Sequence, residues 1–139
     1  MTKDPRGIRN NNPLNIRKGC NWYGERHPQV DRDFEEFQSM ELGIRAAFIL
    51  LRNYITGFHG KSFKYNTIRK VIRRWAPPTE NATQNYIDFV CKQVGKDQNE
   101  VIYFSDRTTM ITMARAMAFV ECGQWIDPVK FQTAYDMLL

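Results

Sequence analysis

The sequence predicts a mainly α fold (α+β class): a single helical domain over residues 1–139, with a small β-hairpin near its N-terminus. Two observations support this prediction. From residue 39 onward, apolar side chains recur at helical spacing between capping residues and glycine or proline stops. Residues 1–38 are instead rich in Asn, Gly, Pro and alternating aromatics, which is typical of loops and short strands. The sequence contains no repeat or linker that would divide the chain, and 139 residues are enough for one hydrophobic core.

The segment R-G-I-R-N-N-N-P-L-N-I-R, residues 6–17, is the most unusual part of the chain. Because Asn-Pro disfavours helix, Asn10, Asn11 and Asn12 are predicted to lie on an exposed loop that leads into an extended run. Their amides carry donors and acceptors that could bind a neutral ligand rich in hydroxyl or amide groups. The alternative is that these asparagines only cap and turn the chain.

The predicted hairpin and the first helix follow. Strands of the hairpin would come from residues 14–17, 22–23 and 34–37, where aromatic or aliphatic side chains alternate with polar ones. Ser39 is a suitable N-cap for a helix that continues to Gly57.

Two shorter helices are predicted next. Thr67 caps one, which ends before the prolines at residues 77–78 and carries a basic face. Another begins at Asn81 or Thr83 and is closed by Gly95.

The C-terminal third is predicted to hold the central helix. Residues 98–104 are expected to form a short helical turn, after which Asp106 or Thr108 caps a long apolar helix that ends at residues 121–123. Because this helix is apolar on nearly all sides, it should be the buried centre of the domain. The last helix is expected over residues 128–138, with proline at its first position.

Composition excludes several classes of protein. No run approaches the roughly 18 apolar residues of a membrane span, and no signal segment is seen at the N-terminus, so we expect a protein made in the cytoplasm. Cys20, Cys91 and Cys122 are scattered, so we expect no disulfide, metal or other cofactor. The net charge of +5 suggests an anionic partner.

Glu121 is the most suggestive titratable residue, because it ends the most apolar helix. Burial and a helix C-terminus both disfavour the carboxylate, and a protonated acid is what glycosidic bond cleavage requires. Glu25, on the predicted hairpin, is the candidate second carboxylate. The alternative for each is an ordinary surface charge.

Aromatic and basic residues suggest binding surfaces. Trp22, Tyr23 and Tyr86 could stack on sugar rings, although aromatics at helical spacing are more often core. The basic face of residues 69–74 is the best signal for nucleic acid. It is weak, because such a face is commonly only solvated, so nucleic-acid binding is not the expected function.

The motifs resemble a family of phage and prophage proteins, often virion-associated. These motifs are R-G-I-R-N-N-N-P-L-N-I-R, S-M-x-x-G-I-R-A-A from residue 39, T-I-x-x-V-I-x-R-W-A-P-P-x-E-N-x-T-x-x-Y from residue 67, and V-E-x-G from residue 120. Membership would imply phage particle proteins as partners.

A more distant resemblance suggests a role. N-P-L-N-I at residues 12–16, followed by a helix opening S-M-x-x-G-I, resembles the N-P-x-G-I segment of lysozyme-like glucosaminidases and lytic transglycosylases. In those enzymes a helix ending Glu-Ser-Gly lies upstream, whereas here the matching A-F-V-E-C-G occurs at residues 118–123. The resemblance therefore implies a lysozyme-like domain that is circularly permuted.

That resemblance also implies a function and a site. The function is cleavage of peptidoglycan glycan strands, of the lytic transglycosylase or the muramidase/glucosaminidase type, with Glu121 as general acid. The substrate would be bound by Asn11, Asn12, Asn15, Trp22, Tyr23 and Tyr86. The alternative is a non-catalytic virion structural or wall-binding protein that keeps the fold without the chemistry.

Overall fold

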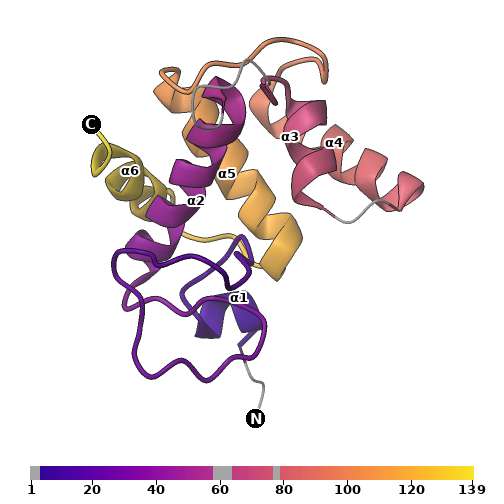
Figure 1. The fold of residues 1–139 in the computed structure, drawn as a ribbon. Coiled ribbons are helices and arrows are strands. Elements are labelled where there is room, and N and C mark those ends of the chain that lie inside the picture. The colour runs from indigo at the N-terminus through magenta and orange to yellow at the C-terminus, as the bar shows by residue number, and fades with distance from the viewer. Residues whose placement is uncertain (1–3, 58–63, 77–78) are drawn as a thin grey trace.

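A computed structural model describes residues 4–57, 64–76 and 79–139, which are mainly α-helical and form no β-strand (Figure 1). Six helices are formed within these ranges: α1 (Arg6–Arg9), α2 (Met40–Thr56), α3 (Ile68–Trp75), α4 (Glu80–Val94), α5 (Arg107–Cys122) and α6 (Pro128–Asp136). The predicted mainly α class is confirmed.

The predicted capping residues begin most of the long helices. Side-chain oxygens of Ser39, Thr67, Asp106 and Asp127 accept hydrogen bonds from backbone N–H groups in the first turns of α2, α3, α5 and α6. Each cap satisfies a donor that has no partner inside the helix. At the other ends, α4 and α5 are followed by glycines in the left-handed conformation.

Three predicted boundaries differ from the structure. The α4 helix starts at Glu80, and α6 ends at Asp136 instead of residue 138. Residues 98–104 form no helix; Val101 instead makes an antiparallel bridge with Thr67. The predicted stop at residues 77–78 lies outside the described residues.

The α5 helix is central, as its composition predicted. In Figure 1 it runs between α2 and α6 on one side and α3 and α4 on the other. Its side chains Met110, Met113, Ala114 and Met117 are completely buried. Sixteen residues make it roughly 24 Å long, so it spans much of the domain.

The predicted hairpin is reduced to two isolated antiparallel bridges, Arg17 with Phe34 and Glu25 with Phe37. The Asn12 side chain makes hydrogen bonds that backbone groups of paired strands would otherwise make with each other. Its amide nitrogen donates to the carbonyls of Ile16 (2.9 Å) and Glu35 (3.0 Å), and its oxygen accepts from the Ile16 N–H (2.9 Å). One side chain therefore satisfies backbone groups that strand pairing would otherwise satisfy.

The prediction that Asn10, Asn11 and Asn12 lie on an exposed loop is wrong for two of them. Asn10 is 5% exposed and Asn12 is fully buried. The reason is that α1 and the following turn fold back over residues 31–37, so the amides find partners inside the protein. Asn10 donates to Asp31 and Asn11 donates to the Phe37 carbonyl.

Gly43 lets this turn sit directly on α2. A Cβ at Gly43 would lie 1.7 Å from the carbonyl oxygen of Asn11, so no larger residue fits without movement of the backbone. Asn11 itself has a φ of 52°, which asparagine tolerates better than most residues. The two sequence motifs at residues 6–17 and 39–47 therefore pack directly against each other.

Candidate functional site

The Glu121 carboxyl lies where the last turn of α5 meets the asparagine segment. Glu121 is half-buried, and the Asn15 amide nitrogen lies 3.4 Å from its Oε1 and 3.3 Å from its backbone oxygen. The Tyr86 hydroxyl, from α4, is hydrogen-bonded to the same carboxyl and lies 3.4 Å from the Met117 carbonyl. Three segments far apart in sequence thus converge on one acid.

The surroundings of Glu121 favour its protonated form. Burial raises the pKa of this carboxyl above its ordinary value. The hydrogen bonds from Tyr86 and Asn15 act in the opposite direction, because they stabilise the anion, but burial is the larger effect. The pKa of Tyr86 lies well above its usual range, chiefly because the hydroxyl is buried, so it stays a hydrogen-bond donor.

Gly7 allows Asn15 to reach Glu121. A Cβ on Gly7 would lie 3.1 Å from the Asn12 carbonyl oxygen, 3.3 Å from Asn15 Oδ1 and 3.3 Å from the Cys122 Cβ. The α1 turn therefore packs against the end of α5 at a residue without a side chain. Asn15 has a φ of 55°, which aims its amide back toward the helix.

A cleft of about 310 Å³ lies on the other side of Asn15. Its walls come from residues 15–20, from Trp22, and from aromatic residues of α2 and α3. Tyr54 and Trp75 meet edge to face with ring centroids 5.7 Å apart, and the Trp75 indole N–H donates to the Leu14 carbonyl at 3.2 Å. Asn15 both lines this cleft and contacts Glu121, and it therefore connects the cleft with the acid, which is not itself among the residues of the cleft walls.

Glu25 is not a partner of Glu121 among the described residues. Its Oε1 accepts from the Trp22 backbone N–H at 3.2 Å, and it is hydrogen-bonded to the carboxyl of Glu35. Glu35 is buried, and its Oε2 has no other partner in the described part of the chain. Burial and the neighbouring Glu25 raise the pKa of Glu35 to about 7. Glu35 therefore holds a proton up to about neutral pH, next to the Glu25 carboxyl.

The other predicted site residues lie in different surroundings. Asn11 is partly buried and its amide donates to the Phe37 carbonyl. Asn15 and Trp22 line the cleft. Asn12 is buried and fully engaged within the protein, and Tyr86 is 7% exposed, so in this conformation neither presents a surface to a ligand. Tyr23 is well exposed with the Arg45 guanidinium over its ring, away from the cleft walls.

Tyr54 and Trp75 line the cleft but are not among the site residues that the sequence predicts. Tyr54 is one of the apolar positions of a predicted helix, and Trp75 is an aromatic residue that could stack on a sugar face but at helical spacing is more often core. Both assignments follow from helical spacing, which shows that a residue faces inward but not that a cleft opens there.

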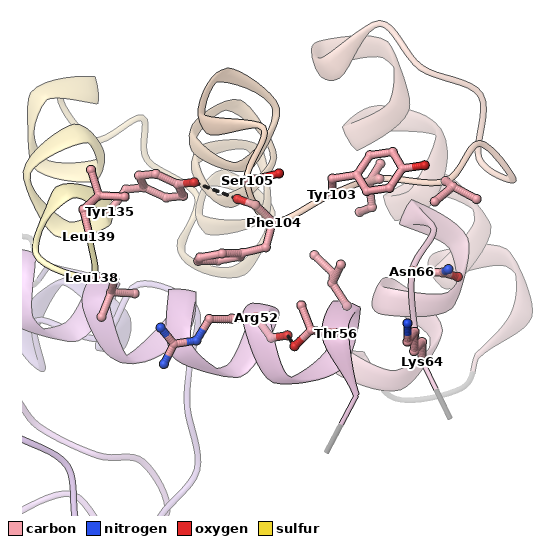
Figure 2. Close-up of a pocket in the computed structure, with 13 residues that line it drawn as sticks. Arg52, Thr56, Lys64, Asn66, Tyr103, Phe104, Ser105, Tyr135, Leu138 and Leu139 are labelled. Carbon is pink, nitrogen blue, oxygen red and sulfur yellow. Dashed lines mark hydrogen bonds between the residues drawn. The ribbon is translucent and has the colours of Figure 1, made fainter. Parts of the chain in front are cut away.

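A second groove lies at the opposite end of α5, where no functional residue was predicted. It measures about 610 Å³ and is formed by the C-terminal parts of α2 and α6 and by residues 101–105. Figure 2 shows the Tyr135 hydroxyl pointing to the Phe104 carbonyl, which it reaches at 2.7 Å, with Arg52 and Lys64 at the side of the groove.

The described residues lack the features of a metal centre and of a membrane span. Those residues contain no group of three or more His, Cys, Asp or Glu side chains placed to hold a metal ion. Nor does any described helix have the length and apolar character needed to cross a membrane.

Comparison with known proteins links the chain to a phage. No family model matches the sequence. The chain is 42% identical over 99 residues to Protein P5 of Pseudoalteromonas phage PM2. The match covers 68% of this chain and 59% of P5, so the chain spans about three fifths of the length of that relative. The chain is therefore homologous to a phage protein, which supports the predicted association with a phage.

Proposed function

We propose that the protein cleaves peptidoglycan glycan strands with Glu121 as general acid. The observation that carries the proposal is the meeting of Glu121 with Asn15: a half-buried carboxyl with a raised pKa lies beside an amide that also lines an aromatic cleft. A protonated carboxyl can donate its proton to the oxygen of a glycosidic bond as that bond breaks.

The single carboxyl favours the lytic transglycosylase type of reaction. Hydrolysis with either stereochemical outcome uses two carboxyl groups that flank the bond. Within the described residues the hydrogen-bond partners of the Glu121 carboxyl are an amide and a phenol, and Glu25 is engaged with Glu35. In the proposed reaction Glu121 first protonates the leaving oxygen. As a carboxylate it then accepts the proton of the sugar's own 6-hydroxyl, whose oxygen closes an anhydro ring at the sugar carbon.

The cleft supplies groups suited to an N-acetylated sugar. The Asn15 amide can bond to an acetamido group or a hydroxyl, and the rings of Trp22 and Tyr54 offer apolar faces for a sugar ring. In the lysozyme-like interpretation, α5 takes the place of the usual first helix, and the chain order is permuted. The homology to a phage protein supports a role in a phage particle or in release from the host.

Replacing Glu121 tests this proposal. Glu121→Gln keeps the size of the side chain but cannot donate the proton, so release of soluble muropeptides from purified peptidoglycan should fall by at least a hundredfold. Glu100→Gln, at an exposed residue paired with Lys96, is the matched control and should retain wild-type activity. Unchanged activity of Glu121→Gln would remove this residue as the acid.

A non-catalytic virion protein is the second candidate, because the relative at 42% identity is a phage protein. For that candidate, the wild-type protein should release no muropeptides. The wild type and Glu121→Gln should then co-purify with phage particles equally well.

A further inference from the structure

We propose that the basic face of α3 binds the phosphate backbone of double-stranded DNA without reading its sequence. This basic face consists of Arg69, Lys70, Arg73 and Arg74. Lys70, Arg73 and Arg74 are exposed, and Arg69 is half-buried. DNA binding at this face is a second function, separate from the proposed cleavage of glycan strands.

The net charge of the protein is concentrated in the segment that contains α3. Residues 64–76 hold five of the 20 Lys and Arg residues and none of the 15 Asp and Glu residues, so this segment carries a charge of +5. The other Lys and Arg residues equal the Asp and Glu residues in number, so the rest of the chain is neutral. A net charge confined to one segment produces a local positive potential, which attracts polyanions to that segment.

The fold holds the basic face outward. The side chains of Ile68, Val71 and Ile72 are completely buried, and the Thr67 hydroxyl accepts the Lys70 backbone N–H at 3.2 Å. With 3.6 residues per turn, the four cations lie within an arc of about 140° on the opposite side of the helix. The core therefore fixes the backbone from which these side chains project.

Within the described residues, none of the four cations forms an ion pair. The ion pairs there involve other cations, which are Arg6, Arg26, Lys96, Arg107 and Lys130. The Gln98 carbonyl accepts the Arg69 backbone N–H at 3.1 Å, which brings residues 97–100 to the edge of α3. Of the two acids in that turn, Asp97 and Glu100, the second is already paired with Lys96. The charges of the basic face are therefore largely available to phosphate groups.

The density of these charges matches a DNA duplex. Arg69 and Arg74 are separated by about 7.5 Å along the helix axis, so the basic face carries roughly one charge per 2 Å. Duplex DNA carries about one phosphate charge per 1.7 Å of its axis, whereas a single strand carries about one per 3.4 Å. Three of the four residues are arginines, whose guanidinium groups can bind phosphate oxygens in a bidentate manner.

A lipid surface fits this helix less well. A helix that lies on a membrane inserts an apolar face among the lipids. In α3 that face is Ile68, Val71 and Ile72, and it is already used in the hydrophobic core. The basic face offers charged groups only, which suits contacts to a phosphate backbone, and such contacts carry no sequence information.

Binding to defined polyanions over a series of salt concentrations tests the inference. Fluorescence anisotropy would compare a short DNA duplex of arbitrary sequence with a single strand of the same length, and co-sedimentation would measure binding to phosphatidylglycerol vesicles. If all four cations contact phosphates, the logarithm of the association constant for the duplex should fall against the logarithm of the salt concentration with a slope of about −3.6. The single strand should bind more weakly than the duplex.

Lys70→Gln/Arg73→Gln removes two exposed charges from the middle of the basic face. The slope for the duplex should become shallower by about 1.8, and the affinity at low salt should fall about tenfold or more. Arg9→Gln/Arg32→Gln is the matched control. It removes two exposed charges and leaves the same net charge, but both residues belong to the N-terminal segment, which lies at the far end of the molecule from α3 in Figure 1. It should keep the affinity and the slope of the wild type.

Several results would overturn the inference. Equal losses in Lys70→Gln/Arg73→Gln and in the control would show that net charge, and not this face, attracts DNA. An unchanged slope in Lys70→Gln/Arg73→Gln, or a single strand that binds as tightly as the duplex, would also contradict it. So would vesicle binding that depends on this face when duplex binding does not. Lys70→Arg/Arg73→Lys keeps both charges and should bind like the wild type, which separates loss of charge from loss of structure.

Discussion

At the scale of single residues, Tyr86 acts on Glu121 rather than on a ligand. Its hydroxyl is buried and donates to the carboxyl, which stabilises the anion and lowers the pKa of the acid. Tyr86→Phe removes that bond, so the pKa of Glu121 should rise. A general acid must be protonated, so activity is lost as the pH rises through the pKa of Glu121. In the variant this loss should occur at a higher pH.

The measurement is a pH profile of muropeptide release, with a titration of the Glu121 carboxyl resonance by NMR as a second readout. Tyr103→Phe, at an exposed tyrosine of the second groove, is the control and should leave both curves unchanged. A profile of Tyr86→Phe that keeps its position or moves to lower pH would contradict the assigned contact.

Glu35 gives a second expectation at this scale, for stability. Its pKa is about 7 in the folded protein and lies near the ordinary glutamate value when unfolded. The folded state therefore holds an extra proton between about pH 4.5 and pH 7, so stability should fall as pH rises through this window. Glu35→Gln stays uncharged and should flatten this fall in thermal unfolding followed by circular dichroism. Parallel curves for the wild type and this variant would exclude the buried proton, and Glu100→Gln should match the wild type.

At the scale of elements, the contact between the asparagine turn and α2 depends on Gly43. Replacing a helical glycine by alanine ordinarily stabilises a protein by about 1 kcal/mol. Gly43→Ala should instead destabilise the protein by about 1–3 kcal/mol or more, because the new Cβ would overlap the Asn11 carbonyl oxygen. Urea unfolding measures the difference, and Asn53→Ala in the same helix should change stability little. A stabilised Gly43→Ala would show that the turn does not pack there.

The sequence predicted helices better than it predicted the N-terminal segment, for a physical reason. A cap such as Ser39 bonds to a backbone group three residues away, so its role can be inferred locally. Asn12 bonds to a carbonyl 23 residues away, and nothing in the local sequence distinguishes it from an exposed turn residue. The hairpin was overpredicted for the same reason. Alternating apolar and polar residues cannot show that a side chain, and not a paired strand, bonds to the backbone.

The proximity of Asn15 to Glu121 is a different case. These residues are 106 positions apart, and neither spacing nor composition relates them. Only the resemblance to a permuted lysozyme-like order led us to expect them together. Tyr54, which forms part of the cleft, was visible in the sequence only as one more apolar position of a helix.

At the scale of the whole molecule, two surfaces of different character border α2. The cleft next to Asn15 is lined by Leu50 and Tyr54, and the second groove is lined by Arg52, Ile55 and Thr56 of the same helix. Glu121 lies at the C-terminal end of the central helix α5. The net charge of +5 is carried by residues 64–76, where the basic face of α3 suits an anionic polymer. This arrangement places the proposed chemistry at one end of the central helix, where α1 also packs (Figure 1).

Mass spectrometry of the fragments released from purified peptidoglycan tests the central claim most directly. Acid catalysis by Glu121 with attack by the sugar's own hydroxyl predicts fragments ending in anhydro-sugars from the wild type, and none from Glu121→Gln. Fragments with reducing ends would contradict transglycosylation, and anhydro fragments from both proteins, or no fragments from either, would contradict the role of Glu121.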